Sequence, residues 1–165
     1  MATLATASGY PYPATTETPD VQRDLKALVD YLEAKTATAT AFTPTWTAST
    51  TNPAIGNGTI AAAWWKVGNL VFFRIKVTAG STTTFGTGSY TLTLTGLPTP
   101  VTGIRQVIPA GIYARGAAST AFQGLLNGSL AMPLYVTTAF TALASTTAAW
   151  ASGDTFEITG HYMAA

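Results

Sequence analysis

One amphipathic segment, residues 18–35, places the strongest constraint on how this chain can fold. Its apolar side chains recur four, three and four positions apart, which is the spacing of a coiled-coil stripe. The stripe consists of Val21, Leu25, Leu28 and Leu32, and Val29 widens it on one side. Thr18 is the expected N-cap, and Pro19 suits the first helical position. The sequence therefore predicts a helix within residues 18–36.

A helix of this length needs a partner. It would be roughly 26 Å long, and isolated helices of that size are marginal in water. Two partners fit the stripe: a β domain of the same chain, or further copies of the helix. We favour self-association, because the heptad spacing is the pattern of helices that pack on one another.

Charge is distributed very unevenly along the chain. Eight of the fifteen charged residues lie between Glu17 and Lys35, and only seven follow. Those seven are Lys66, Arg74, Lys76, Arg105, Arg115, Asp154 and Glu157. A monomeric domain of residues 42–165 would expose about 6,000 Å², so each charge would serve about 900 Å². The sequence therefore predicts that copies of the chain or a larger assembly cover much of this surface.

The composition argues against several classes of partner. The net charge is +1 and no Lys/Arg cluster occurs, so we expect no nucleic-acid surface. The chain has no cysteine, which excludes disulfides and thiolate chemistry. No run of eighteen apolar residues is present, so we expect no membrane insertion. The first residues also lack the basic and apolar regions of a signal peptide.

The segments that flank the helix are small and polar. Residues 1–17 contain Tyr10, Pro11, Tyr12 and Pro13, a run that favours an extended, polyproline-like conformation. Two interpretations remain open for this segment: a disordered tail, or an anchoring arm whose tyrosines dock on another protein. Residues 37–41 follow the helix and are expected to be a short connector.

Residues 42–165 have the pattern of a mainly β head. Short alternating segments recur about every ten residues and are separated by Gly, Pro and Asn. Besides an edge-like strand that opens at residues 42–46, we expect strands at 59–67, 70–79, 90–95, 106–115, 121–126, 130–138 and 155–163. Pro109 and Pro133 should mark edges or bulges. About eight short strands predict a jelly-roll-like antiparallel β-sandwich.

Three apolar runs are candidates for the core of the head and for contacts between copies. They are Tyr90, Leu92 and Leu94; Leu130, Met132, Leu134 and Val136; and Phe156, Ile158 and Tyr162. A fourth set, Val71, Phe73, Ile75 and Val77, shares one face of its strand. We expect Arg74, Lys76, Glu157 and His161 to face solvent or one another.

The sequence contains no pattern typical of a catalytic, metal or cofactor site. His161 is the only histidine, and by alternation it shares a strand face with Glu157. A metal site would need more ligands, and an acid–base pair would need an activated nucleophile or a second carboxylate. The glycine-rich stretches lack the order of a phosphate loop. We therefore expect a protein that is not an enzyme and needs no cofactor.

The tryptophans are more informative. Trp64 and Trp65 are adjacent on one expected strand, so they must point to opposite faces of the sheet. Three roles remain open for the outward one: a platform on which a sugar stacks, an anchor at an interface, or a half-buried side chain. Trp46 and Trp150 lie beside turns and are expected in the core.

Several motifs occur in an order that resembles a known family. The stretch FTPTWTASTTNPAIGNGTI is followed by VGNLVFFRIKVTAGSTTTFGTGSYTLTL, and the chain closes on WASGDTFEITGHYMAA. These pieces, at about residues 42–97 and 150–165, resemble a β-domain of minor tail proteins of actinobacteriophages. The stretch YPYPATTETPDVQRDLKALVDYLE is similar to the tyrosine–proline arm and helix at the start of many phage tail and fibre proteins.

The resemblance implies a virion structural protein. It would be a homotrimer, assembled in the host cytoplasm and exposed on the extracellular particle as a surface fibre or spike. Its arm would bind other virion proteins, either of the tail or the major capsid protein, and its head could contact a host surface glycan. A capsid decoration (cement) protein is the alternative, because the chain lacks an extended shaft. A carbohydrate-binding module is the alternative from another class.

Overall fold

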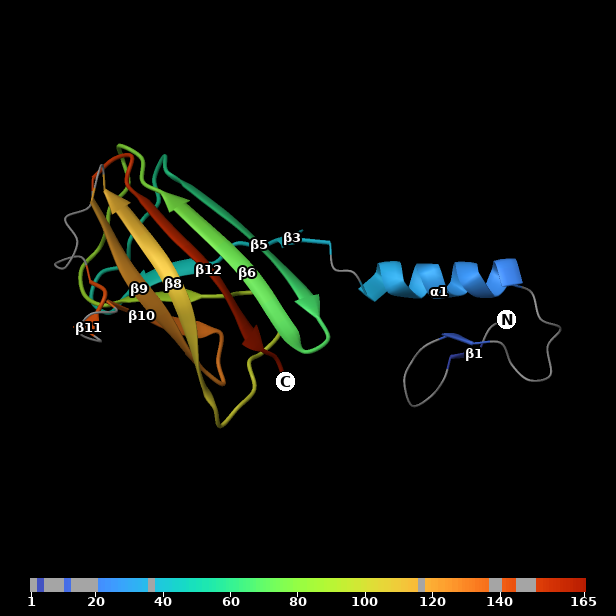
Figure 1. The fold of residues 1–165 in the computed structure, drawn as a ribbon. Coiled ribbons are helices and arrows are strands. Elements are labelled where there is room, and N and C mark those ends of the chain that lie inside the picture. Colours follow the sequence, from blue (N-terminus) through green and yellow to red (C-terminus); the bar gives the residue numbers. More distant parts are fainter. Residues whose placement is uncertain are drawn as a thin grey trace. The chain divides into compact units, whose positions relative to one another are not determined.

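The computed structural model describes residues 3–4, 11–12, 21–35, 38–115, 118–136, 141–144 and 151–165. The chain divides into two units, residues 1–38 and residues 39–165. The first unit contains the helix and the second is built from antiparallel strands (Figure 1). The expected mainly β fold with one short helix is therefore confirmed.

The described residues of the N-terminal unit form one helix and one short strand pair. Helix α1 spans Val21–Lys35, within the predicted range, and an ion pair joins Lys26 to Asp30 one turn later, with Nζ and Oδ2 2.9 Å apart. The expected cap residues Thr18 and Pro19 lie outside the described residues. In the arm, β1 (Thr3–Leu4) pairs antiparallel with β2 (Pro11–Tyr12).

The strands of the head form one continuous antiparallel sheet. Along the sheet their order is β3, β5, β6, β12, β8, β9, β10, β7 and β4, and β11 pairs with β10 beside this path. Their bounds are β3 Thr40–Ala41, β4 Thr45–Ala48, β5 Thr59–Val67, β6 Leu70–Thr78, β7 Tyr90–Thr93, β8 Arg105–Arg115, β9 Ala118–Asn127, β10 Ala131–Val136, β11 Thr141–Ala142 and β12 Thr155–Met163. The expected connector, residues 37–41, thus contributes β3 to the head by pairing with β5.

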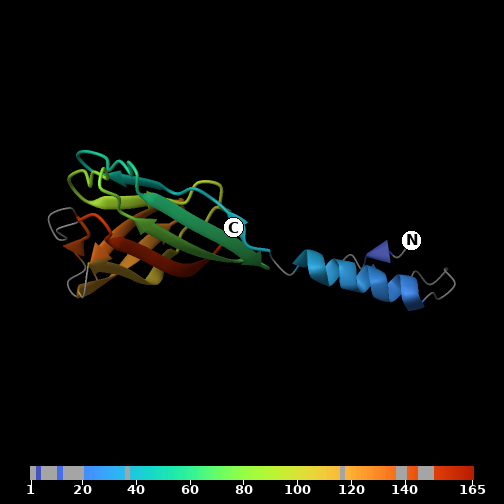
Figure 2. The same cartoon turned by 90° about the horizontal axis from the view of Figure 1, so that it is seen from above.

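The sheet folds over on itself to make two layers. Both views place β4 and β7 on one side of the portion formed by β6 and β12 (Figures 1 and 2). Strand β10 makes the corner: residues 131–133 pair with β7, whereas residues 134–136 pair with β9. Pro133 stands where the partner changes, and proline suits such a break because it cannot donate a ladder hydrogen bond.

Local irregularities lie where the sequence predicts them. Gly68 and Asn69 form the tight connection between β5 and β6, and Gly68 adopts a φ of 58°, which a residue without a Cβ tolerates. The pairing of β8 with β9 shifts register between Ile108 and Gly111, which places Pro109 in a bulge. Both prolines therefore mark irregular positions, as expected.

The space between the two layers is filled by the predicted apolar runs. On β6 the alternation is complete: Val71, Phe73, Ile75 and Val77 are buried, whereas Arg74 and Lys76 between them are exposed. The other buried side chains from these runs are Tyr90, Leu92, Leu94, Met132, Leu134, Phe156, Ile158 and Tyr162. Leu130 and Val136 pack against this core and are half-buried.

One part of the expectation for these runs is wrong. We expected the same strands to supply contacts between copies through their apolar faces, but those faces are already covered within one chain. Leu92, Leu94 and Met132 are each 0% exposed. The sheet folds over and uses the apolar faces to join its own two layers, so any contact between copies must use other side chains.

A pair of loops closes one end of the head. The Asn57 side chain accepts a hydrogen bond from the Thr82 backbone N–H at 2.9 Å and donates one to Ser81 Oγ at 3.0 Å. Gly86 has a φ of 59°, and a Cβ there would meet the backbone of Thr51. These contacts fasten residues 49–58 to residues 80–89 through backbone and small polar side chains.

Candidate functional site

The outward face of β5, β6 and β12 carries most of the candidate site residues of the head. The inner side chains of these strands enter the core, so alternation directs their neighbours outward. Pairing then aligns the outward side chains in rows across the three strands. We call this surface, made by the outward residues of β5, β6 and β12, the outer face.

An aromatic row crosses the outer face near one end of the three strands. Trp65 pairs with Phe72, and Phe72 pairs with His161. The rings of Trp65 and Phe72 are stacked, with centroids 5.5 Å apart and planes inclined by 8°, and the His161 ring lies 5.8 Å from that of Phe72. Trp65 and Phe72 are half-buried and His161 is exposed. The stack fixes the plane of the indole ring while leaving part of it in solvent.

The next rows along the strands carry charge. Arg74 lies beside Thr159, and the following row joins Lys76 to Glu157 through an ion pair of 2.7 Å between Nζ and Oε1. Both members of that pair are about half exposed, so the pair adds little to stability. No carboxylate among the described residues forms an ion pair with Arg74. The two cations and one carboxylate therefore leave one positive charge on this part of the face.

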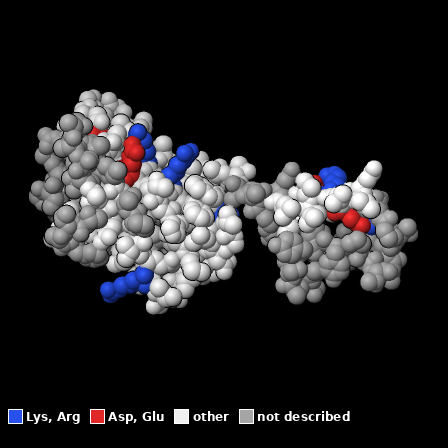
Figure 3. Space-filling view, viewed as in Figure 1, with Lys and Arg blue, Asp and Glu red and all other residues white. Residues whose placement is uncertain are grey.

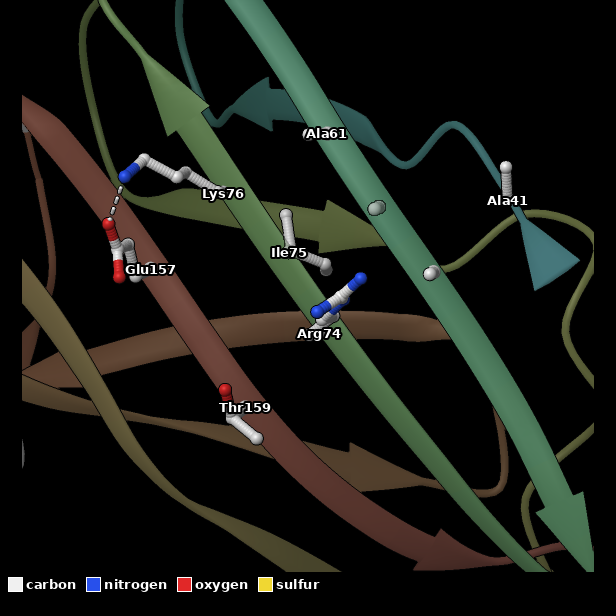
Figure 4. Close-up of a pocket in the computed structure, with 9 residues that line it drawn as sticks. Ala41, Ala61, Arg74, Ile75, Lys76, Glu157 and Thr159 are labelled. Carbon is white, nitrogen blue, oxygen red and sulfur yellow. Dashed lines mark ion pairs between the residues drawn. The ribbon is translucent and has the colours of Figure 1, made fainter. Parts of the chain in front are cut away.

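A shallow groove runs over these charged rows. It encloses about 510 Å³, and β3 forms its wall with Ala41 (Figure 4). Ala61 and Ala63 of β5 lie on its floor, opposite Lys76 and Arg74. Larger side chains at the two alanines would fill this space, so the hollow follows directly from the small residues on β5.

The structure separates the two adjacent tryptophans as predicted. Trp64 turns inward and packs against the core, whereas Trp65 lies on the outer face. Trp46 is buried, as expected, and Trp150 lies outside the described residues.

Glu157 and His161 share the outer face, as predicted, but they have different partners. Glu157 pairs with Lys76, while the His161 ring lies against Phe72. Four positions along a strand separate them, which is about 13 Å. The arrangement can therefore bind a ligand through hydrogen bonds, charge and ring contacts. The described part of the chain contains no group of three metal-binding side chains.

A group of exposed apolar side chains, which we did not expect from the sequence, lies at one end of the head. Val67 and Met163 flank Leu70 on the outer face, in the row next to the aromatic one. Val67 is 55% and Met163 54% exposed, and Val107 on β8 is similarly exposed. Alternation offered part of this signal: along β5 it places Val67 on the same face as Trp65, and along β12 it places Met163 on the same face as His161.

The predicted oligomerisation residues of α1 leave much of their surface uncovered. Val21, Leu25 and Leu32 are 68%, 56% and 48% exposed, and Leu28 is half-buried. Val29, which widens the stripe, is also exposed. The stripe thus remains available to a partner.

The described residues of the predicted anchoring arm are few. Pro11 and Tyr12 form β2, whereas Tyr10 and Pro13 lie outside the described residues. The docking role of the arm stays a prediction.

Comparisons with protein-family models, with curated proteins and with solved structures found no match for this chain. Among the described helices, none has the length and apolar character required to cross a membrane.

Proposed function

We propose that this protein is a non-enzymatic structural component of a bacteriophage virion, a trimeric fibre or spike on the tail or the head of the particle. The observation that carries the proposal is the apolar stripe of helix α1. Its side chains recur at heptad spacing, and most of them are exposed in the single chain. Packing the stripes of three copies together would remove these side chains from water, with about 25 cal/mol gained per Å² of apolar surface. The resemblance of the arm and head to phage proteins supplies the biological setting.

The surface of the head also has the character of a protein that works within a larger assembly. Figure 3 shows a face on which a few small clusters of charged atoms stand among uncharged side chains. Several large apolar residues are also exposed, including Val67, Val107 and Met163. Exposed apolar surface with little charge is typical of proteins that work within larger assemblies.

The finer description of the architecture belongs to the same proposal. We propose a trimeric coiled coil formed by α1 and a head of the jelly-roll-like sandwich type. The heptad stripe supports the coiled coil. The antiparallel sheet, which is folded into two layers, supports the sandwich. Capsid decoration remains the alternative location, because a short helix and a compact head suit a cement protein equally well.

Deletion of residues 1–17 tests the proposed attachment. We expect the truncated protein to fold with an unchanged melting temperature, since the head has its own core. Phage assembled with the truncated protein should lack it, as measured by mass spectrometry of purified particles. Normal incorporation of the truncated protein would contradict an anchoring arm. Absence of the full-length chain from particles would contradict the virion role itself.

A further inference from the structure

We infer that the groove on the outer face, together with the aromatic row beside it, is a binding site for an acidic saccharide that carries a single carboxylate. This inference concerns the isolated chain and does not depend on a virion role. It uses the aromatic row of Trp65 and Phe72, the cation Arg74, and the hollow over Ala61 and Ala63.

The backbone of β6, in the centre of this face, is occupied, so a ligand over this strand must be recognised by side chains. Strand β6 is paired along its whole length with β5 on one side and β12 on the other, and β3 covers the far edge of β5 at residues 63–64. A peptide therefore cannot add to β6 as a new strand, because strand addition requires a free edge. The groups offered to a ligand are an indole ring, a guanidinium, an ammonium, a carboxylate and a threonine hydroxyl.

This set of groups matches a sugar. Sugar hydroxyls both donate and accept hydrogen bonds, and the groove supplies donors at Arg74 and Lys76 and an acceptor at Glu157. The aromatic row lies two residues farther along the strands, about 7 Å away. One ligand of two rings can thus lie against Trp65 and reach Arg74, and the volume of about 510 Å³ lies in the range of small-molecule sites.

The charge of the site selects an acidic saccharide over a neutral one. Glu157 is matched by Lys76, which leaves Arg74 without a carboxylate partner among the described residues. A guanidinium presents two parallel N–H groups that fit the two oxygens of a carboxylate. Ala63 is the residue paired with Arg74 on β5, and its small side chain leaves space for this group to approach.

The test uses the full chain and two disaccharides that differ by one carboxylate, cellobiouronic acid and cellobiose. Binding is followed through the indole N–H signal of Trp65 in nuclear magnetic resonance spectra, assigned with the Trp65→Phe variant. We expect cellobiouronic acid to shift this signal and to bind more tightly than cellobiose. Arg74→Gln should weaken binding of the acidic disaccharide by about tenfold, the effect of one hydrogen bond between charged groups.

Arg105→Gln is the matched control. Arg105 is an exposed arginine at the start of β8, outside the groove, so the variant removes the same charge and should leave both affinities unchanged. The inference is overturned if neither disaccharide shifts the Trp65 signal at millimolar concentration, or if the two arginine variants behave alike. A Trp65 signal that moves with protein concentration in the absence of sugar would also overturn it, because the face would then be a contact between copies.

Discussion

The indole of Trp46 lies nearly parallel to the ring of Phe156, with ring centroids 6.3 Å apart and planes inclined by 13°. Trp46 belongs to β4 at one end of the strand path, whereas Phe156 belongs to β12 in its middle. Phe156 also stacks on Phe122 of β9, with centroids 4.7 Å apart. Phe156 is therefore one of the side chains through which the two layers of the folded sheet meet.

Replacing Phe156 by alanine should strongly destabilise the head. The side chain is 2% exposed, and truncation of a buried phenylalanine costs about 3–5 kcal/mol because it leaves a cavity. The measurement is the free energy of unfolding from chemical denaturation. Met163→Ala is the control on the same strand: its side chain is 54% exposed, and we expect a loss of about 0.5 kcal/mol or less. Equal losses would contradict the assignment of the inner and outer faces.

Tyr162 gives the head a dependence on alkaline pH. Its ring is buried, and its hydroxyl donates a hydrogen bond to the carbonyl oxygen of Pro98 at 2.6 Å. Burial raises the pKa of this phenol well above its ordinary value. A raised pKa means that the folded state holds the proton more tightly, so this contribution to stability is fully present below about pH 10 and is lost as the pH rises further.

The Tyr162→Phe variant separates this effect from general alkaline unfolding. We expect the variant to lose about 1 kcal/mol at neutral pH, because the Pro98 carbonyl loses its donor. Above about pH 10 its free energy of unfolding should fall less steeply than that of the original protein. Parallel pH profiles measured by chemical denaturation would show that Tyr162 does not contribute to the dependence.

The apolar stripe of α1 should control self-association. Leu25→Asp combined with Leu32→Asp places two carboxylates on the exposed stripe, and we expect the oligomer to dissociate at micromolar concentration in native mass measurements. Lys26→Asp is the matched control, because it changes the net charge by the same amount at a position outside the stripe. A full chain that is monomeric without any substitution would contradict the coiled-coil proposal.

The head should fold without other copies. Its apolar runs are buried within one chain, so residues 39–165 should unfold with a midpoint that does not depend on protein concentration. The measurement is thermal unfolding over about a hundredfold range of concentration. A midpoint that rises with concentration would show that contacts between heads contribute to folding, as the scarcity of charge first suggested.

Local patterns in the sequence were sufficient to predict the helix and the longer strands, but not the short strands β1, β2, β3 and β11. Helix α1 was predicted from the spacing of its apolar residues Val21, Leu25, Leu28 and Leu32, because side chains three and four positions apart lie on one face of a helix. Strand β6 and its buried face were predicted from the alternation of apolar and polar residues around Phe73, because successive side chains of a strand point to opposite sides. Gly68, Pro109 and Pro133 marked irregular positions through the φ and hydrogen-bond limits of single residues.

The tertiary structure decided which surfaces meet. Alternation required Trp64 and Trp65 to point oppositely, but only the folding of the sheet determined that Trp64 faces the core and Trp65 the aromatic row. In the same way, the groove over Ala61 depends on the pairing of β5 with β6 and on the position of β3. A local pattern fixes the two sides of a strand, whereas contacts between residues far apart in the sequence decide which side is covered.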